Sequence, residues 1–507
     1  MNQHPLTLSP IAPSLRSLNG QRVLVVGLGE SGLAMVQWLT QQGAVVRVLD
    51  HAEQPAAAKQ LVALQPPPER YFGAARFSHA ECLHGVDLIA LSPGVPLRSP
   101  LLQAALASGI ALVSEIELFV CGLRQYIPRA RLIAITGSNG KTTTTALTGK
   151  LCAASGQQTM VAGNISPSAL DALMQVLAAQ ACAKPLALPE IWVLELSSFQ
   201  LETSYTLNAD VATVLNLSPD HLDRYAGMAE YSAAKARIFQ QDATRPAGIA
   251  VINRDDAACQ ALSTGSRQRV SFGLNPPPSA ADYGVVDGFI VHGETRLVAC
   301  SALRLVGQHN IANAMAALAL SAALEIPTPQ VLPTLVNFAG LPHRVAFVAR
   351  VADVDYYDDS KGTNVGASLA AIEGLIDATA RAAGHKIVVI LGGEGKGQDF
   401  APLASALHTH ARAVALMGRS AQAIAAILPP TLVQQICHDM DEAVRWSAAQ
   451  AQAGDRVLLS PACASFDLYR NYVHRAEVFI DAVRRLQNGA DLPSAPINAG
   501  FNEPGAK

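Results

Sequence analysis

The sequence lacks paired cysteines, runs of charge of one sign and apolar segments long enough to span a membrane. Its eight cysteines are scattered without a C-x-x-C pair, which argues against a zinc site or a disulfide framework and fits a reducing compartment. The formal net charge is only −3 and no Lys/Arg run occurs, so nothing indicates a nucleic-acid surface. Residues 1–19 lack the basic stretch and apolar core of a signal peptide. These absences predict a cytoplasmic protein without a nucleic-acid partner or membrane insertion.

The length of 507 residues exceeds what one hydrophobic core supports and predicts three domains. Half of the residues are hydrophobic and 15% are charged, which is typical of a well-buried globular protein. Stretches rich in proline or small residues at 66–68, 178–189 and 276–281 predict surface loops. The end of the chain, residues 488–507, is rich in Gly, Pro, Asn and Ala and predicts a disordered tail.

The first segment carries a strand, a glycine turn and a helix start at residues 22–32. Gly27, Gly29 and Gly32 fit the pattern G-x-G-x-x-G, and Asp50 ends a second strand, 45–49, about twenty residues later. By the residues alone, this pattern indicates a dinucleotide fold with Asp50 on a ribose, or merely a tight turn that packs a helix on a strand. Glu30 lies inside the turn, where a negative charge is an odd neighbour for phosphate.

The stretch 132–147 combines an apolar strand with the turn Gly137-Ser-Asn-Gly-Lys-Thr142 and a helix. Backbone N–H groups of such a turn and the helix N-terminus face an anion. Lys141 would supply a charge for the β- and γ-phosphates, and the Thr142 hydroxyl could ligate Mg²⁺. Only two residues separate Gly137 from Gly140, whereas the standard P-loop has four residues between its first glycine and its Gly-Lys pair. A plain turn with a surface lysine is the alternative interpretation.

Three further residues of the central segment suit metal or proton chemistry. Glu195 ends the apolar strand 191–194, where a carboxylate beside a phosphate loop could ligate a metal or cap the next turn. His221 follows the strand 211–216 in Asp220-His-Leu-Asp-Arg-Tyr225 and could ligate a second Mg²⁺ or handle protons. Asn310 opens an alanine-rich helix, where it could cap the helix or contact a ligand. Lys235, in the predicted helix 231–239, would by itself be a surface lysine.

The last segment alternates strands and helices, with strands before residue 358 and at 387–391, 414–417 and 456–459. This pattern predicts a Rossmann-like unit with ligands at the strand ends. Four polar residues in those loops would suit an amino-acid carboxylate, although the lysines could equally be solvated: Lys361, Thr363, Lys396 and Ser465.

The loop Thr136-Gly-Ser-Asn-Gly-Lys-Thr142 and the string Asp220-His-Leu-Asp-Arg-Tyr225 resemble the Mur ligases. In the last segment, Asp-Ser-Lys-Gly-Thr-Asn, Leu-Gly-Gly-Glu-Gly-Lys and Ser-Pro-Ala-Cys-Ala-Ser resemble the D-glutamate-adding members. The resemblance implies a three-domain α/β fold: an N-terminal Rossmann-like UDP-binding domain (1–115), a central P-loop ATPase-type domain (116–341) and a C-terminal Rossmann-like domain (342–487). It also implies a monomeric, ATP-dependent amide ligase of peptidoglycan synthesis. Such a ligase joins D-glutamate to UDP-N-acetylmuramoyl-L-alanine through an acyl phosphate and releases ADP and phosphate.

The resemblance also assigns residues to roles. The catalytic group is Lys141, Lys235, His221 and Glu195. The two Mg²⁺ ions would be held by Thr142 with Glu195 and by His221 with Lys235, the latter carbamylated by CO₂. The residues implied for ATP are Gly137, Ser138, Asn139, Gly140, Lys141, Thr142, Thr143, Asn310, Arg344 and Asp359. Those implied for the UDP substrate are Gly29, Ser31, Gly32, Asp50, His51, Gly94, Asn164 and Ser197. Those implied for D-glutamate are Lys361, Thr363, Lys396, Ser465, Phe466 and Tyr472.

Two alternatives stay open at the level of sequence. One is another ATP-dependent amide ligase, either a different Mur ligase or a folylpolyglutamate synthetase. The first segment weighs against the folate enzyme, which has no uridine-nucleotide domain before its ATP loop. The other is an NAD-dependent oxidoreductase built on Gly27–Gly32, which leaves the Lys141 loop unexplained.

Overall fold

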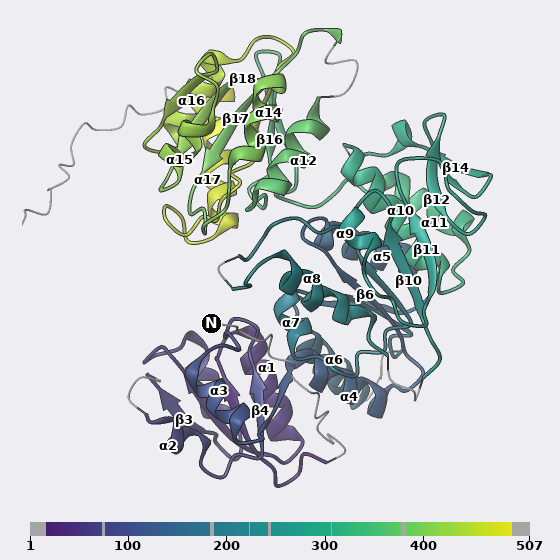
Figure 1. Cartoon of the computed structure of the whole chain (residues 1–507), viewed down its shortest axis with the longest axis vertical. Coiled ribbons are helices and arrows are strands. Elements are labelled where there is room, and N and C mark those ends of the chain that lie inside the picture. The colour runs from purple at the N-terminus through teal and green to yellow at the C-terminus, as the bar shows by residue number, and fades with distance from the viewer. Residues whose placement is uncertain are drawn as a thin grey trace, which may run out of the picture. The chain divides into compact units, whose positions relative to one another are not determined.

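The computed structural model describes residues 17–73, 77–182, 187–222, 224–241, 245–305, 307–376 and 382–488. In these ranges the strands form three separate sheets of five, nine and six strands (Figure 1). The chain divides into two compact units, the first made of 1–218, 224–304 and 310–338, the second of 219–223, 305–309 and 339–507. The first unit holds the five- and nine-stranded sheets. The predicted disordered tail lies outside the described residues from position 489 onward.

The five-stranded sheet is parallel and has the order β3-β2-β1-β4-β5. Its strands are β1 (Arg22–Val26), β2 (Val45–Asp50), β3 (Glu69–Phe72), β4 (Leu88–Leu91) and β5 (Ala111–Ser114). The helices are α1 (Glu30–Gln41), η1 (Ala56–Ala63), α2 (His79–Leu83), α3 (Pro100–Ala107) and α4 (Glu115–Tyr126). Because alternate residues of a strand point to opposite faces, Val23 and Val25 enter one core cluster while Leu24 enters another. Both faces are therefore covered, as a parallel sheet requires.

The nine-stranded sheet has the order β14-β13-β12-β11-β10-β9-β6-β8-β7. Its parallel part comprises β6 (Arg131–Thr136), β7 (Thr159–Gly163), β8 (Ile191–Glu195), β9 (Val211–Val214), β10 (Ile249–Asn253) and β11 (Gln268–Phe272). The helices are α5 (Lys141–Ala154), α6 (Ala169–Gln180), α7 (Ser198–Glu202), α8 (Met228–Ala236), α9 (Ala257–Gln260), α10 (Gln308–Ala322) and α11 (Thr328–Asn337), with the short turns η3 (Arg237–Phe239) and η4 (Cys300–Ala302). The predicted strands at 132–136, 191–194 and 211–216 are present, the last ending two residues early.

An extension of this sheet was not predicted. It consists of β12 (Tyr283–Val286), which pairs parallel with β11, and of β13 (Phe289–His292) and β14 (Thr295–Ala299), which continue from β12 in antiparallel pairs. The turn between β12 and β13 is Asp287-Gly288, and both residues have positive φ, as a two-residue hairpin requires. The Asp287-Gly288 pair between two short apolar runs is the sequence pattern that could have predicted this hairpin.

The first two sheets share a continuous hydrophobic core. Trp38 of α1, Phe119 of α4 and Leu173 of α6 belong to one buried cluster that extends to the central strands. A Cβ on Gly122 would lie 2.7 Å from the Trp38 ring, so only glycine permits this close approach. Since α4 packs on helices of both domains, the domain boundaries predicted near 115, 341 and 487 stay a prediction.

The six-stranded sheet has the order β15-β16-β20-β17-β18-β19. Its strands are β15 (Ala346–Val351), β16 (Val354–Asp358), β17 (Ile387–Gly392), β18 (Ala411–Met417), β19 (Val433–Ile436) and β20 (Arg456–Leu459), with only β15 antiparallel. The helices are α12 (Val365–Leu375), α14 (Ala401–His410), α15 (Ala421–Ile427), α16 (Met440–Gln450) and α17 (Tyr472–Gln487), and they cover both faces (Figure 1). The predicted Rossmann-like alternation is confirmed. Among the described residues, none of the helices is both long and apolar enough to cross a bilayer.

Candidate active site

The phosphate-type loop joins the buried strand β6 to helix α5. Gly137 has φ +156° and Gly140 has φ +79°, a left-handed value that glycine adopts without strain. A Cβ on Gly140 would lie 2.5 Å from Oδ1 of Asn313, which packs against the turn from α10. Asn313 in turn donates to Oδ1 of Asn310 at 3.2 Å. The turn is thus held against α10 and leads directly into the N-terminus of α5, the end of a helix that favours an anion.

Two residues after β9 fix this loop, although no local sequence pattern marks them. Asn216 accepts from the Asn139 backbone N–H at 2.7 Å and donates to the Asn139 carbonyl at 3.1 Å. The Ser138 hydroxyl donates to the Ser218 carbonyl at 3.0 Å. Since β9 pairs with β6, polar residues following β9 had to meet the loop that follows β6. The pairing of β9 with β6, which local sequence patterns do not give, is needed to place Asn216 and Ser218 beside this loop.

Lys141 is the first residue of α5, and its ammonium lies within the loop. Nζ donates to the carbonyls of Gly137 at 2.7 Å and Ser138 at 2.8 Å. Lys141 is therefore half-buried against the loop, and its role toward phosphate stays a prediction. Thr142 and Thr143 follow as the next residues of the helix, in its first turn.

Lys235 is buried, with 2% of its surface exposed, which corrects the interpretation as a surface lysine. Its Nζ donates to the Gly137 carbonyl at 2.9 Å and to Thr136 Oγ1 at 3.2 Å, and lies 4.8 Å from the centre of the Tyr231 ring. A buried amine beside a phosphate-type loop is unusual, because burying a charge without a function is costly. The position therefore singles out Lys235 as a functional candidate.

Glu195 ends β8 and is buried. Its Oε1 accepts from Asn164 Nδ2 at 3.0 Å, whereas its Oε2 is buried without a hydrogen-bond partner. An unsatisfied buried carboxylate oxygen is what a Mg²⁺ ligand presents before the ion arrives. In the described part of the chain, no three His, Cys, Asp or Glu side chains cluster, but the predicted ligands include a threonine and a modified lysine. The residues therefore fit a magnesium site at Glu195.

The first glycine turn is built by close backbone packing. A Cβ on Gly32 would lie 2.0 Å from the Gly27 carbonyl oxygen. Asp50 accepts from the backbone N–H groups of Leu28 at 2.7 Å and Ala52 at 2.8 Å, so its carboxylate holds the turn. Glu30 accepts from the Ser166 hydroxyl at 2.6 Å in the central domain, which accounts for a negative charge at this turn.

The other residues predicted for the UDP substrate differ in exposure. Gly29, His51 and Gly94 are exposed and Ser31 is half-buried. Ser197 caps α7, because its hydroxyl accepts from the Gln200 N–H at 3.2 Å. These positions neither contradict nor test the predicted contacts.

His221 belongs to the second unit, whereas Glu195 and Lys235 belong to the first. It has φ +54°, and its backbone N–H donates to Asp220 Oδ1 at 3.0 Å. Asp220 also accepts from Asn364 Nδ2 at 3.3 Å. Asp223 of the same motif lies outside the described residues. The predicted pairing of His221 with Lys235 at a second metal stays a prediction.

Three loops meet at the strand ends of the third sheet and carry most residues predicted for D-glutamate. Glu394 and Ala464 exchange backbone hydrogen bonds of 2.9 Å, which joins the loop of Lys396 to that of Ser465. Arg475, buried on α17, donates to the Ser360 carbonyl at 2.8 Å and to the Cys463 carbonyl at 3.1 Å. Arg475 was missed by the sequence analysis, because nothing local marks a helical arginine as buried.

The remaining side chains of this group lie around the same loops. Lys361 Nζ lies 3.8 Å from the centre of the Tyr472 ring, and the Thr363 N–H donates to the Lys361 carbonyl at 2.9 Å. Lys396 has φ +50°, while Ser465 is buried and Phe466 is 71% exposed. The loops therefore present two cations and an exposed aromatic ring beside buried polar groups.

Asp359 is buried at the end of β16 and accepts from Ser460 Oγ at 2.6 Å. Burial raises the pKa of Asp359 to about 7, although the hydrogen bond from Ser460 and the positive charge of Arg344 both act to lower that pKa. The carboxyl group therefore sits near its titration point at neutral pH.

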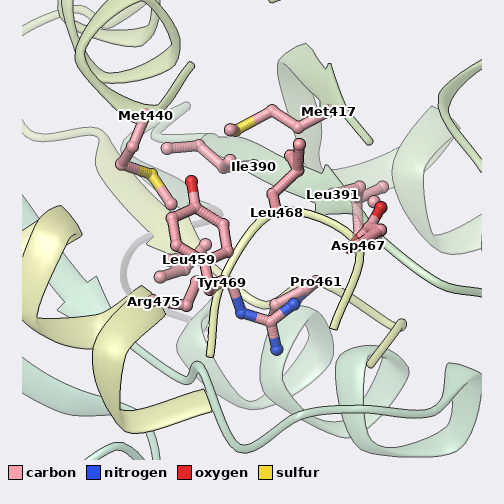
Figure 2. A pocket seen from close by; sticks show the side chains of 12 residues that line it. Ile390, Leu391, Met417, Met440, Leu459, Pro461, Asp467, Leu468, Tyr469 and Arg475 are labelled. Atoms are coloured by element: carbon pink, nitrogen blue, oxygen red, sulfur yellow. The ribbon is translucent and has the colours of Figure 1, made fainter. Parts of the chain in front are cut away.

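A small pocket in the third domain lies beside Arg475. Figure 2 shows Ile390, Met417 and Met440 around Tyr469, with Arg475 at its edge. None of the residues predicted for D-glutamate lines it. Its mainly apolar lining indicates a packing defect beneath the 467–469 segment rather than the site of a charged substrate.

Comparisons with known proteins cover most of the chain. The Mur ligase MurD-like N-terminal domain matches residues 21–114, the Mur ligase middle domain 135–321 and the Mur ligase glutamate ligase domain 343–463. A UDP-N-acetylmuramoylalanine–D-glutamate ligase of Dechloromonas aromatica is 55% identical over 93% of this chain and 100% of its own. The chain belongs to the Mur ligase family. A ligase of the same name from Nitrosospira multiformis is 48% identical over 93% of this chain and 97% of its own.

Solved Mur ligases share the fold. MurF from Acinetobacter baumannii superposes with a TM-score of 0.57 at 17% identity, covering 92% of each chain. MurC from Thermotoga maritima gives 0.55 at 19% identity, over 91% of this chain and 99% of its own. The family assignment confirms the three-domain α/β prediction. It also removes the oxidoreductase alternative, because the glycine turn at Gly27 lies in a MurD-like N-terminal domain.

Proposed function

We propose that this chain is an ATP-dependent amide ligase that joins D-glutamate to UDP-N-acetylmuramoyl-L-alanine in peptidoglycan synthesis. The observation that carries the proposal is the 55% identity, across the full length of the relative, to a ligase named for that reaction. The geometry supports it, because a phosphate-type loop, a buried carboxylate and a buried lysine gather at the strand ends of the central sheet. The proposed domains are 1–115 for the UDP substrate, 116–341 for ATP and 342–487 for the amino acid.

The first proposed step brings together two anions. The L-alanine carboxylate of the UDP substrate attacks the γ-phosphorus of ATP, the bond from that phosphorus to the bridging oxygen breaks, and ADP leaves. The resulting acyl phosphate holds an activated carbonyl carbon. Lys141, whose Nζ lies at the Gly137 and Ser138 carbonyls of the loop, would neutralise charge on the β- and γ-phosphates. Glu195 and Thr142 would hold one Mg²⁺ ion, which would supply positive charge against the phosphates.

Lys235 is proposed to act as a carbamate. The neutral amine would attack the carbon of CO₂ and release a proton, which leaves an anionic carbamate that would hold a second Mg²⁺ together with His221. The position of the amine supports this proposal, because Nζ is buried 2.9 Å from the Gly137 carbonyl oxygen of the phosphate-type loop.

The second proposed step forms the amide. The amine of D-glutamate attacks the acyl carbon and loses a proton, and phosphate leaves with the carbonyl–phosphate oxygen. Lys361, Thr363, Lys396 and Ser465 would hold the carboxylates of D-glutamate, with Phe466 and Tyr472 beside them. The charges of the two lysines suit a dicarboxylate, since each carboxylate gains a charge-assisted hydrogen bond. The described cysteines are free thiols, which supports a cytoplasmic location.

Phosphate release from ATP tests the proposal. The protein is incubated with UDP-N-acetylmuramoyl-L-alanine and either D-glutamate, L-glutamate or meso-diaminopimelate. We expect turnover only with D-glutamate. Turnover with another amino acid would keep the ligase chemistry and overturn the assignment of the third domain. Absence of turnover with all three would overturn the proposed function.

A further inference from the structure

Arg224 forms a buried ion pair that the proposed chemistry does not use. It belongs to the string Asp220–Tyr225 but, unlike His221, lies in the first unit. Its Nη2 donates to Glu202 Oε2 at 2.7 Å and its Nε to Oε1 at 3.3 Å. The two side chains are only 10% and 11% exposed. A paired guanidinium and carboxylate with this geometry is directional and hard to replace by lysine.

The surroundings of the pair fix its orientation. The guanidinium carbon of Arg224 lies 4.0 Å from the centre of the Phe199 ring. The Tyr225 hydroxyl donates to Glu202 Oε1 at 2.5 Å. Phe199 and Glu202 both belong to α7, which directly follows the strand of Glu195. The arginine is therefore anchored to the element that leads from the proposed metal ligand.

The remaining donors of Arg224 reach the first domain. Nη1 donates to the Pro93 carbonyl at 2.8 Å, and Nη2 lies 3.4 Å from the Val95 carbonyl oxygen. These two carbonyls flank the exposed Gly94 in the turn after β4. The same turn packs on the first glycine turn, since a Cβ on Gly27 would lie 2.9 Å from Ser92 Cβ and 3.1 Å from Val95 Cγ2. One buried cation thus joins the central domain to the turn that borders the first glycine loop.

A second ion pair between these domains provides a comparison. Arg98 donates to Glu230 at 2.8 Å, but the side chains are 58% and 47% exposed. Exposed pairs of this kind contribute little, because water and salt screen them. If any ion pair between the two domains were enough to hold the turn in place, substitutions of Arg98 and of Arg224 would have similar effects.

We infer that Arg224 is a positioning residue for the UDP substrate. By holding the Pro93–Val95 turn against α7, it sets the nucleotide end of the substrate at a fixed distance from the Lys141 loop. The substrate is long, so its uridine diphosphate and its reacting carboxylate contact different domains. A small displacement of the turn would then misplace a group that reacts far from it. This inference rests on the proposed function.

The test compares Arg224→Lys with Arg98→Lys. Arg224→Lys keeps the charge but loses the paired geometry and one or both carbonyl contacts. We expect the KM for the UDP substrate to rise at least tenfold, while the KM values for ATP and D-glutamate change less than twofold. Arg98→Lys should leave all three unchanged. Glu202→Gln, which removes the ionic partner of Arg224, should reproduce the same selective rise.

A purely structural role predicts a different pattern. It would lower the melting temperature of Arg224→Lys and leave the KM for the UDP substrate unchanged, and that result would overturn the inference. Hydrogen exchange of residues 92–98 gives a readout independent of turnover. We expect faster exchange there in Arg224→Lys than in the wild type or Arg98→Lys, and equal exchange would also overturn the inference. If the wild type fails to turn over, the proposed function fails, whereas the exchange comparison still decides whether Arg224 holds the turn.

Discussion

Asn164 donates from Nδ2 to Oε1 of Glu195 at 3.0 Å, and its backbone N–H donates to the Glu195 carbonyl at 2.8 Å. Glu195 ends β8, and Asn164 directly follows the neighbouring strand β7, whose last residue Gly163 allows the two strand ends to approach closely. A Cβ on Gly163 would lie 2.2 Å from the Glu195 carbonyl oxygen. This arrangement leaves Oε2 of Glu195 buried and unpaired. Asn164 therefore orients the carboxylate that we propose as a Mg²⁺ ligand.

Asn164→Ala should weaken magnesium binding. Loss of a partner that orients a metal ligand typically costs about 10–100-fold in affinity. We expect the Mg²⁺ concentration for half-maximal turnover to rise within that range, as measured by a magnesium titration at saturating ATP. Asn337→Ala removes an exposed amide on α11 and serves as the matched control. An unchanged magnesium requirement in Asn164→Ala would contradict the role of this hydrogen bond.

Lys235→Ala should abolish turnover, because the proposed carbamate would be lost. A small carboxylate such as acetate at high concentration should restore part of the activity by occupying the space of the carbamate. Lys150→Ala, which removes the exposed lysine on α5, should retain full activity without acetate. The measurement is phosphate release with and without acetate. Full activity in Lys235→Ala would remove the carbamate from the mechanism.

Much of this site could be predicted from the sequence, because local patterns determine it. The apolar run before Gly137, the two glycines and Lys141 are consecutive, so a strand, turn and helix followed directly. Glu195 was found for the same reason, since a single carboxylate ends an apolar strand. These features can be predicted without knowing which strands are neighbours in the sheet.

The residues that were missed depend on long-range contacts. Asn216 reaches the Asn139 backbone only because β9 lies beside β6, and Arg475 reaches Ser360 across more than a hundred residues. Lys235 lies on a helix whose sequence does not distinguish the buried face from the exposed one. Only the family resemblance marked it. The burial of charged side chains such as Lys235 and Arg475 was thus the feature of the site that was hardest to predict from the sequence.

Arg475→Lys should impair D-glutamate binding. The guanidinium joins the loops of Ser360 and Cys463 through three hydrogen bonds, and an ammonium cannot span them with the same geometry. We expect the KM for D-glutamate to rise about tenfold, which corresponds to about 1.4 kcal/mol, with the KM for the UDP substrate unchanged. Arg484→Lys, at an exposed position on the same helix, is the control. Equal effects on both KM values would indicate general loosening instead.

Glu115 should make the stability of the protein depend on pH. It is buried at the start of α4, accepts from the Leu170 N–H at 2.5 Å and leaves Oε2 without a partner. Burial raises its pKa from 4.5 to about 7, so the folded state binds more protons than the unfolded state between these values. Its contribution to the free energy of unfolding therefore falls as pH rises from 4.5 to 7 and is constant above.

Glu115→Gln should remove this dependence. Relative to the wild type, the variant should gain on the order of 2 kcal/mol between pH 5 and pH 8, since one pKa unit corresponds to about 1.4 kcal/mol. Urea unfolding at both pH values measures the difference, and the comparison cancels any constant cost of the buried amide. Glu325→Gln, at a position far from α4 along the chain, controls for the loss of one carboxyl group. A difference that does not change with pH would contradict the raised pKa.

Gly140→Ala should damage the phosphate loop in two ways. It places a side chain at φ +79° and brings a Cβ within 2.5 Å of Asn313 Oδ1. Gly156, at the other end of α5, has φ +87° but open space around its Cβ position. Gly156→Ala therefore measures the backbone cost alone, which is about 1 kcal/mol for a left-handed residue.

The two substitutions separate the effects. We expect Gly156→Ala to lower the free energy of unfolding slightly with the KM for ATP unchanged, and Gly140→Ala to raise that KM at least tenfold. Adding Asn313→Ala to Gly140→Ala removes the clash but not the strained φ, so it should restore part of the stability. Because Asn313 also holds the loop, the KM for ATP should remain high in the double variant. Equal losses in both single variants would show that the packing of Asn313 on Gly140 does not shape the phosphate loop.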